Sequence, residues 1–142
     1  FFNLFNINAI HFGNFITTIE DGYNSTIPYH NQIHAADVLQ NTFWLSTRES
    51  LQTQLLSIDV FSALIAAAIH DYAHPGLNNA FQVATNSDLA LRYNDKSVLE
   101  MMHCSEAFLI LKKESHNIFS GLPKSVKNEI RSLIIGMVLG KI

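Results

Sequence analysis

The fold of this chain is set by the segment FSALIAAAIHD, residues 61–71. Its first nine residues, Phe61–Ile69, are small or apolar apart from one serine, and a run of this kind is typical of a buried helix. Residues 57–59 predict the N-cap, at Ser57, and the first turn of this helix, which we expect to continue through His70.

Several other segments repeat apolar residues at helical spacing, and none alternates as a half-buried strand does. The pattern predicts an all-α, multi-helix bundle that forms one domain over residues 1–142. We expect helices that end near residues 21–22, cover 30–46, 88–93 and 97–114, and begin near Pro123, with a loop and a short helix at 77–85 and turns at 24–28 and 94–96.

Composition excludes several classes of protein. The chain has 142 residues, of which 48% are hydrophobic and 15% charged, as in a globular domain rather than a disordered one. A net charge of −3 without a block of Lys or Arg gives no sign of a nucleic-acid partner. The apolar run over residues 58–69 is too short to span a membrane. Cys104 is the single cysteine, so no disulfide can form within the chain. We expect its side chain to be buried, and we expect the protein to be cytoplasmic.

The two ends of the chain look like cut points. It begins with Phe1 rather than Met, and these first residues show no secretory signal because they lack a basic leader and a cleavage pattern. It ends within an apolar helical pattern over residues 133–139. We therefore expect a fragment or an incomplete gene product.

Two clusters of histidines suggest a metal site. His30 and His34 lie four residues apart, which places both imidazoles on one face of a helix. Two histidines alone are weak evidence of metal binding, but His70, Asp71 and His74 add a second cluster at the end of the buried helix. Charged groups at the edge of a core need partners or a metal, although a solvated helix end is the alternative.

The residue types indicate which metal chemistry to expect. Imidazole and carboxylate suit zinc, whereas carboxylate and water suit magnesium or manganese. An aspartate can bridge two ions, and two ions together can clamp a phosphoryl centre. Metal-assisted hydrolysis of a phosphate ester is therefore the hypothesis.

Glu100 has two interpretations that do not exclude each other. It can complete a capping box with Ser97, or it can orient a histidine from outside the metal coordination sphere. His103 lies on the same helix face as Glu100. His11 and His116 stand alone, and we expect them to be surface or hydrogen-bonded histidines.

Four stretches together resemble the catalytic domain of the class I cyclic nucleotide phosphodiesterases, an HD-type all-helical fold. They are YHNQIHAADV at 29–38, HDYAHPGLNNAF at 70–81, YNDKSVLE at 93–100 and MVL at 137–139. The resemblance covers the chain from Asp21 onward, but only the N-terminal and middle part of the family's domain. It implies an enzyme of signal transduction that hydrolyses 3′,5′-cyclic nucleotides to 5′-monophosphates. Residues 87–95 look closer to the members that prefer cyclic AMP over cyclic GMP.

The same resemblance implies a centre with two divalent metal ions, zinc together with magnesium or manganese. His34, His70 and Asp71 look like zinc ligands, and Asp71 also looks like the bridge to the second ion. His74 looks like a partner of the hydroxide that lies between the metals.

Further roles follow from the resemblance for the substrate side. His30 looks like the general acid that protonates the departing 3′ oxygen, and Glu100 looks like the carboxylate that orients His30. His30, Asp71 and Asn79 are the expected substrate contacts. A homodimer is left open.

The chain departs from the family pattern at two places. Met101 and Met102 precede His103 where the family has Asn-His-His, and Gly140-Lys141-Ile142 stands where the family has Ala-Thr-Asp. The rest of the family's domain, with one more aspartate zinc ligand, the purine-binding glutamine and an aromatic clamp, has no counterpart in the sequence. The alternatives are therefore a truncated, inactive interaction module and a broader HD-type phosphohydrolase.

Overall fold

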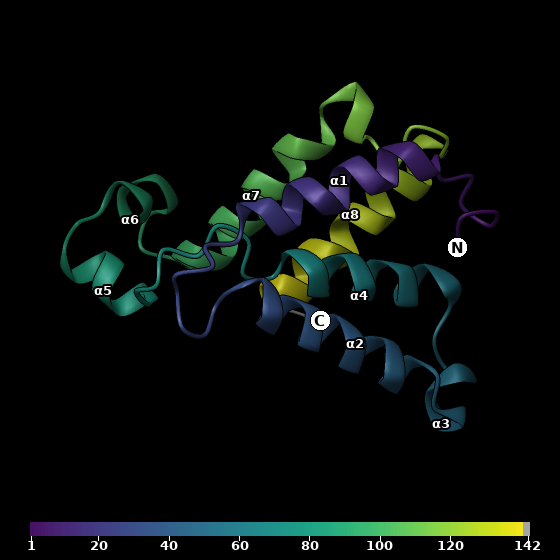
Figure 1. Ribbon diagram of the computed structural model, residues 1–142, viewed down its shortest axis with the longest axis horizontal. Helices are drawn as coiled ribbons and strands as arrows, with labels where there is room; N and C mark the ends of the chain where they lie inside the picture. Colours follow the sequence, from purple (N-terminus) through teal and green to yellow (C-terminus); the bar gives the residue numbers. More distant parts are fainter. Residues whose placement is uncertain (141–142) are drawn as a thin grey trace.

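Helices make up all the regular structure in the computed structural model, which describes residues 1–140 (Figure 1). The all-α prediction is confirmed for this part of the chain. The elements are α1 (Ala9–Gly22), α2 (Gln32–Ser46), α3 (Glu49–Gln52), α4 (Ser57–Ile69), α5 (Asn79–Ala84), α6 (Asp88–Tyr93), α7 (Val98–Leu111), the 3₁₀ turn η1 (Glu114–His116) and α8 (Lys124–Val138).

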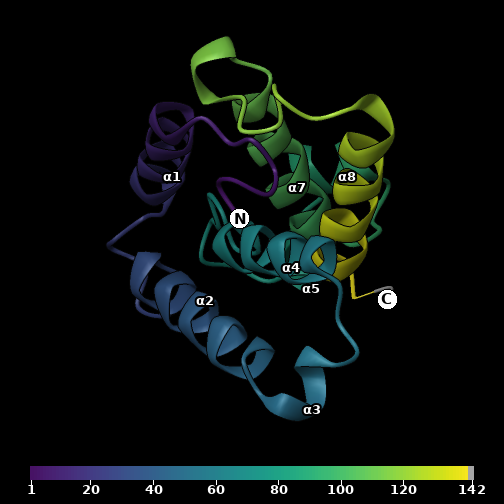
Figure 2. The same ribbon diagram turned by 90° about the vertical axis from the view of Figure 1, so that its right-hand side faces the viewer.

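The apolar helix α4 lies at the centre. It packs along α2 on one side and α8 on the other, and α1 and α7 also contact it (Figure 2). Five of its last six residues are buried, as the apolar run predicts. The short helices α5 and α6 project at one end, beside the start of α7 (Figure 1).

The core is built where these helices meet. Phe15 of α1 and Ile130 and Ile134 of α8 are fully buried, and Ile69 at the end of α4 is 1% exposed. Burying a side chain of this size stabilises a fold by about 1.5–3 kcal/mol. Because Ile69 is packed in the core, the main chain that continues to His70 and Asp71 begins at a fixed position. No helix among residues 1–140 is long and apolar enough to cross a membrane.

The start of α2 differs from the prediction. The Asn31 side chain accepts hydrogen bonds from the amides of Ile33 and His34, at 3.0 and 3.3 Å, and so acts as the N-cap. His30 therefore precedes the helix, and the expectation that His30 and His34 share a helix face is wrong. Sequence spacing missed the strong N-cap preference of asparagine.

The cap of α4 is also shifted. The carboxylate of Asp59 accepts a hydrogen bond of 2.9 Å from the amide of Leu56, so Leu56 is the N-cap and Ser57 the first helical residue. The helix ends at Ile69, with His70 as its C-cap, one residue earlier than expected.

The predicted capping box of α7 does not form. Ser97 has a left-handed backbone, with φ of +44°, and its side chain makes no cap hydrogen bond. Instead, Asn79 Oδ1 accepts a hydrogen bond of 2.9 Å from the Leu99 amide. The helix ends at Leu111 rather than near Glu114, which begins η1. The predicted helices at 88–93 and after Pro123 are confirmed. Residues 141–142, part of the departure from the family pattern, lie outside the described residues.

Candidate metal centre

Three ligand atoms, one from α2 and two from the turn after α4, converge on one point. His34 lies in the first turn of α2, His70 caps α4, and Asp71 follows it. Asp71 Oδ2 is 3.4 Å from His34 Nε2 and 3.1 Å from His70 Nε2, and the two nitrogens are 3.2 Å apart. The long contact between α2 and α4 creates this arrangement from residues that are 36 positions apart in sequence.

The protonation of these groups shows why a cation fits between them. His70 Nδ1 lies 2.8 Å from the Ala67 carbonyl and must donate to it, so the Nε2 lone pair of a neutral ring faces Asp71. Burial disfavours the charged ring, but the hydrogen bond with Asp71 raises the pKa of His70 above its ordinary value. Burial likewise opposes ionisation of Asp71, yet His70 lowers the pKa of its carboxyl group. Acceptors this close repel one another unless a proton or a metal ion lies between them.

The second oxygen of Asp71 faces a different histidine. His103 on α7 is 1% exposed, and its Nδ1 donates a hydrogen bond of 2.6 Å to the Tyr72 carbonyl. Its Nε2 lies 3.8 Å from Asp71 Oδ1. Burial lowers the pKa of His103 to about 4, so the ring is neutral at pH 7 and offers a lone pair from Nε2. The carboxylate therefore presents its two oxygens to two separate sets of nitrogen atoms.

His30 and His74 form a second group with Asp71. Ligand atoms of the three residues lie within 4.8 Å of one another. The rings of His30 and His74 stack with centroids 4.0 Å apart. His74 Nδ1 accepts a hydrogen bond of 2.9 Å from the Gly76 amide, which leaves its proton on Nε2 as a donor. Burial, reinforced by the neighbouring His30, lowers the pKa of His74, so this ring is neutral at pH 7.

A cleft of about 550 Å³ opens beside these rings. His30, Asp71, His74 and His103 line it together with Asn79 and Glu100. Of the predicted site residues, His34 and His70 do not line this cleft and meet Asp71 at its other oxygen. Asn79 Nδ2 donates to both oxygens of the Glu100 carboxylate, at 3.2 and 3.0 Å. Asn79 is therefore the hydrogen-bond partner of Glu100, and the orientation of His30 by Glu100 stays a prediction.

The remaining histidines and the cysteine lie as the sequence predicts. His11 Nδ1 lies 3.4 Å from the Asn117 carbonyl, and His116 Nε2 lies 3.0 Å from Thr18 Oγ1. Cys104 is buried and unreactive in character, because burial raises the pKa of its thiol to about 11.

His103 is the site residue to which sequence reasoning gave no role, although its spacing from Glu100 places it on the same helix face.

Comparison with known proteins identifies relatives of this chain. Residues 29–140 match the model of the 3′5′-cyclic nucleotide phosphodiesterase family. The 3′,5′-cyclic-AMP phosphodiesterase 4 of Dictyostelium discoideum is 48% identical over 139 residues, which are 98% of this chain and 13% of that protein. The rat 3′,5′-cyclic-AMP phosphodiesterase 4C is 43% identical over 125 residues, which are 88% of this chain and 23% of that protein.

A solved structure shares the fold. The phosphodiesterase domain of the RhoPDE fusion protein from the choanoflagellate Salpingoeca rosetta superimposes with a TM-score of 0.91 at 37% identity. The match covers 97% of this chain and 43% of that one. The chain thus spans less than half of this structure and less than a quarter of the two curated relatives.

Proposed function

The chain belongs to the 3′5′-cyclic nucleotide phosphodiesterase family, and on this premise we propose that it supplies the metal-binding half of an active site. The reaction is hydrolysis of a 3′,5′-cyclic nucleotide to the 5′-monophosphate, with cyclic AMP preferred over cyclic GMP. The relatives named as cyclic-AMP phosphodiesterases support this substrate class.

The position of Asp71 carries the proposal. Its Oδ2 faces His34 and His70, whereas its Oδ1 faces the cleft wall at His103. A carboxylate so placed suits one ion on each oxygen. We assign zinc to the side of Asp71 with His34 and His70. We assign magnesium or manganese to the side near the cleft, where water would supply most of the oxygen ligands that these ions prefer. When bound, the two ions would supply an activated water and offset the charge of the phosphoryl oxygens.

The side chains of the cleft have separate tasks in this proposal. His30, next to the cleft and to Asp71, donates a ring proton to the 3′ oxygen as the bond from phosphorus to that oxygen breaks. His74 is neutral and carries its proton on Nε2, from which it can donate a hydrogen bond. Its Nδ1 already accepts from the Gly76 amide, so His74 does not compete for the proton that His30 donates. Asn79 and Glu100 line the same cleft, where Asn79 holds the Glu100 carboxylate in place.

Activity and metal content together test these assignments in the full-length gene product. The His30→Ala variant should lose about 10²–10⁴-fold in turnover of cyclic AMP while keeping its metal, because a general acid contributes on that scale. The Asp71→Ala variant should lose metal and turnover together. His11→Ala is the matched control, since this histidine lies outside the cleft.

Two results would overturn the proposal. Normal turnover by the His30→Ala protein would remove the general acid. A full-length protein that hydrolyses neither cyclic nucleotide with zinc and magnesium present would favour an inactive interaction module.

A cytoplasmic location, a homodimer and the absence of a nucleic-acid partner are further parts of the proposal, the last supported by the net charge of −3.

A further inference from the structure

The turn that carries His70, Asp71 and His74 lies beyond the regular hydrogen bonds of α4. Helix α4 ends at Ile69, and the amide of Tyr72 donates to the Ile69 carbonyl in a tighter turn. Ala73 has a positive φ of 57°, which is strained for a residue with a side chain. Such a turn keeps one conformation only if neighbouring elements hold it.

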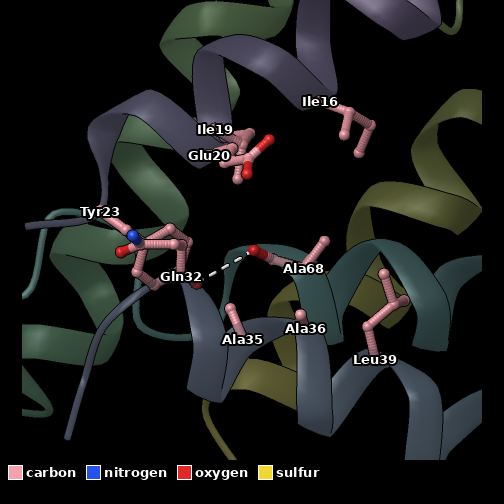
Figure 3. Close-up of a pocket in the computed structure, with 9 residues that line it drawn as sticks. All are labelled: Ile16, Ile19, Glu20, Tyr23, Gln32, Ala35, Ala36, Leu39 and Ala68. Carbon is pink, nitrogen blue, oxygen red and sulfur yellow. Dashed lines mark hydrogen bonds between the residues drawn. The ribbon is translucent and has the colours of Figure 1, made fainter. Parts of the chain in front are cut away.

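Tyr23, at the end of α1, reaches this turn with its hydroxyl group. The hydroxyl donates a hydrogen bond of 3.0 Å to the Ala68 carbonyl, as Figure 3 shows, and accepts one of 3.4 Å from the Asp71 amide. Both are main-chain groups at a helix end, where helical partners run out. One hydroxyl thus joins the last turn of α4 to the main chain of Asp71.

The surroundings of Tyr23 allow its hydroxyl to perform both tasks. The side chain is 6% exposed, and its ring packs edge-to-face on Tyr72 with centroids 6.1 Å apart. A tyrosine hydroxyl has one hydrogen to donate and an oxygen that can accept, so this one group can make both hydrogen bonds.

We propose that Tyr23 is a positioning residue of the metal centre. Its hydroxyl fixes the main chain of Asp71, and thereby aims the carboxylate between His34 and His70. The proposal rests on the proposed function, because it takes Asp71 as a metal ligand. Groups that orient ligands in this way typically change metal affinity by about 10–100-fold when removed.

A cobalt titration of the purified protein measures this effect directly. Co²⁺ reports its coordination by nitrogen and oxygen ligands through visible absorption and gives a dissociation constant without any turnover. The Tyr23→Phe variant keeps the ring and removes only the hydroxyl. We expect its Co²⁺ dissociation constant to rise about 10-fold. Amide hydrogen exchange at Asp71, without metal, should also become faster in this variant.

Two controls separate positioning from a general loss of stability. Tyr93→Phe removes a hydroxyl on α6, outside the metal cluster. Ile130→Val trims a fully buried core residue on α8 and lowers stability without touching the turn. Both controls should bind Co²⁺ within about 2-fold of the parent, against the expected 10-fold change.

The outcomes distinguish this proposal from the function on which it rests. If Tyr23→Phe binds Co²⁺ as tightly as the parent, or if Ile130→Val weakens binding equally, Tyr23 is a structural residue only and the metal centre stands. If the parent protein itself binds no Co²⁺, the metal centre and the role of Tyr23 both fail.

Discussion

Gly22, next to Tyr23, should be a position where a single methyl group disturbs the turn that carries Asp71. A Cβ atom at Gly22 would overlap the ring of Tyr72, whereas a Cβ at Gly13 of the same helix would meet nothing within 4 Å. Gly22→Ala and Gly13→Ala are therefore a matched pair. They make the same chemical change on α1, inside the helix at Gly13 and at its last residue in Gly22, and only at Gly22 does the methyl group meet a neighbouring side chain.

The structure gives opposite signs for the two changes. Replacing glycine by alanine within a helix stabilises by about 0.5–1 kcal/mol, and Gly13→Ala should gain this amount. In Gly22→Ala the Tyr72 ring must move, which gives up its edge-to-face contact with Tyr23 and part of its packing. Overpacking of this kind costs about 1–3 kcal/mol. Because the ring is half-buried and can swing outward, the low end applies, and the net loss is about 1 kcal/mol.

Urea unfolding measures both free energies, and the two variants should differ by about 2 kcal/mol. Repeating Gly22→Ala in a Tyr72→Ala background identifies the obstacle, because removal of the ring should turn the substitution from destabilising to neutral or stabilising. If the two glycine variants agree within about 0.5 kcal/mol, or if the Tyr72→Ala background leaves the loss unchanged, the steric reasoning is refuted.

Three other predictions concern the same region. Asn79→Ala should lower the free energy of unfolding by about 1–2 kcal/mol, since it removes the cap on the Leu99 amide, and an unchanged urea midpoint would contradict this. Cys104, with its thiol pKa of about 11, should react with a disulfide reagent at pH 8 about 100-fold more slowly in the folded chain than in urea, so rapid labelling of the folded chain would exclude its burial. The Ala73→Val variant should melt several degrees below the Ala73→Gly variant, because φ is positive at this position and favours glycine over a residue with a side chain. Equal melting temperatures would argue against strain.

The fold was largely readable from local pattern. The apolar run before His70 predicted α4, and helical spacing with Pro123 predicted α8. Both signals depend on neighbours within a few residues, which is the range over which periodicity and turn chemistry act. The first residues of helices were harder to predict. The helical pattern of α2 extends back to His30 in the sequence, but the Asn31 side chain caps the helix, which begins at Gln32.

The site was only partly readable, because several of its contacts join distant segments. Asn79 lies 20 residues from Leu99, yet it replaces Ser97 as the cap of α7. His103 contacts a carbonyl 31 residues away, and Tyr23 contacts one 45 residues away. Neither the periodicity nor a motif of one segment can predict hydrogen bonds between residues so far apart in sequence. Residue type marked the histidine and aspartate clusters, but the packing of α1, α4 and α7 decided which neighbours support them.

The rigidity of the candidate site comes from the core rather than from the site residues themselves. Without a proton or a cation between them, the nitrogens of His34 and His70 and the Asp71 carboxylate would repel one another. They remain close because Ile69 is packed in the core directly before them, and because hydroxyl and imidazole groups from α1 and α7 hold the main chain of the turn. A cation that enters such a cluster gains attraction without reorganising its ligands. The burial of Ile69 at the end of α4 therefore fixes the position from which the ligand-bearing turn begins.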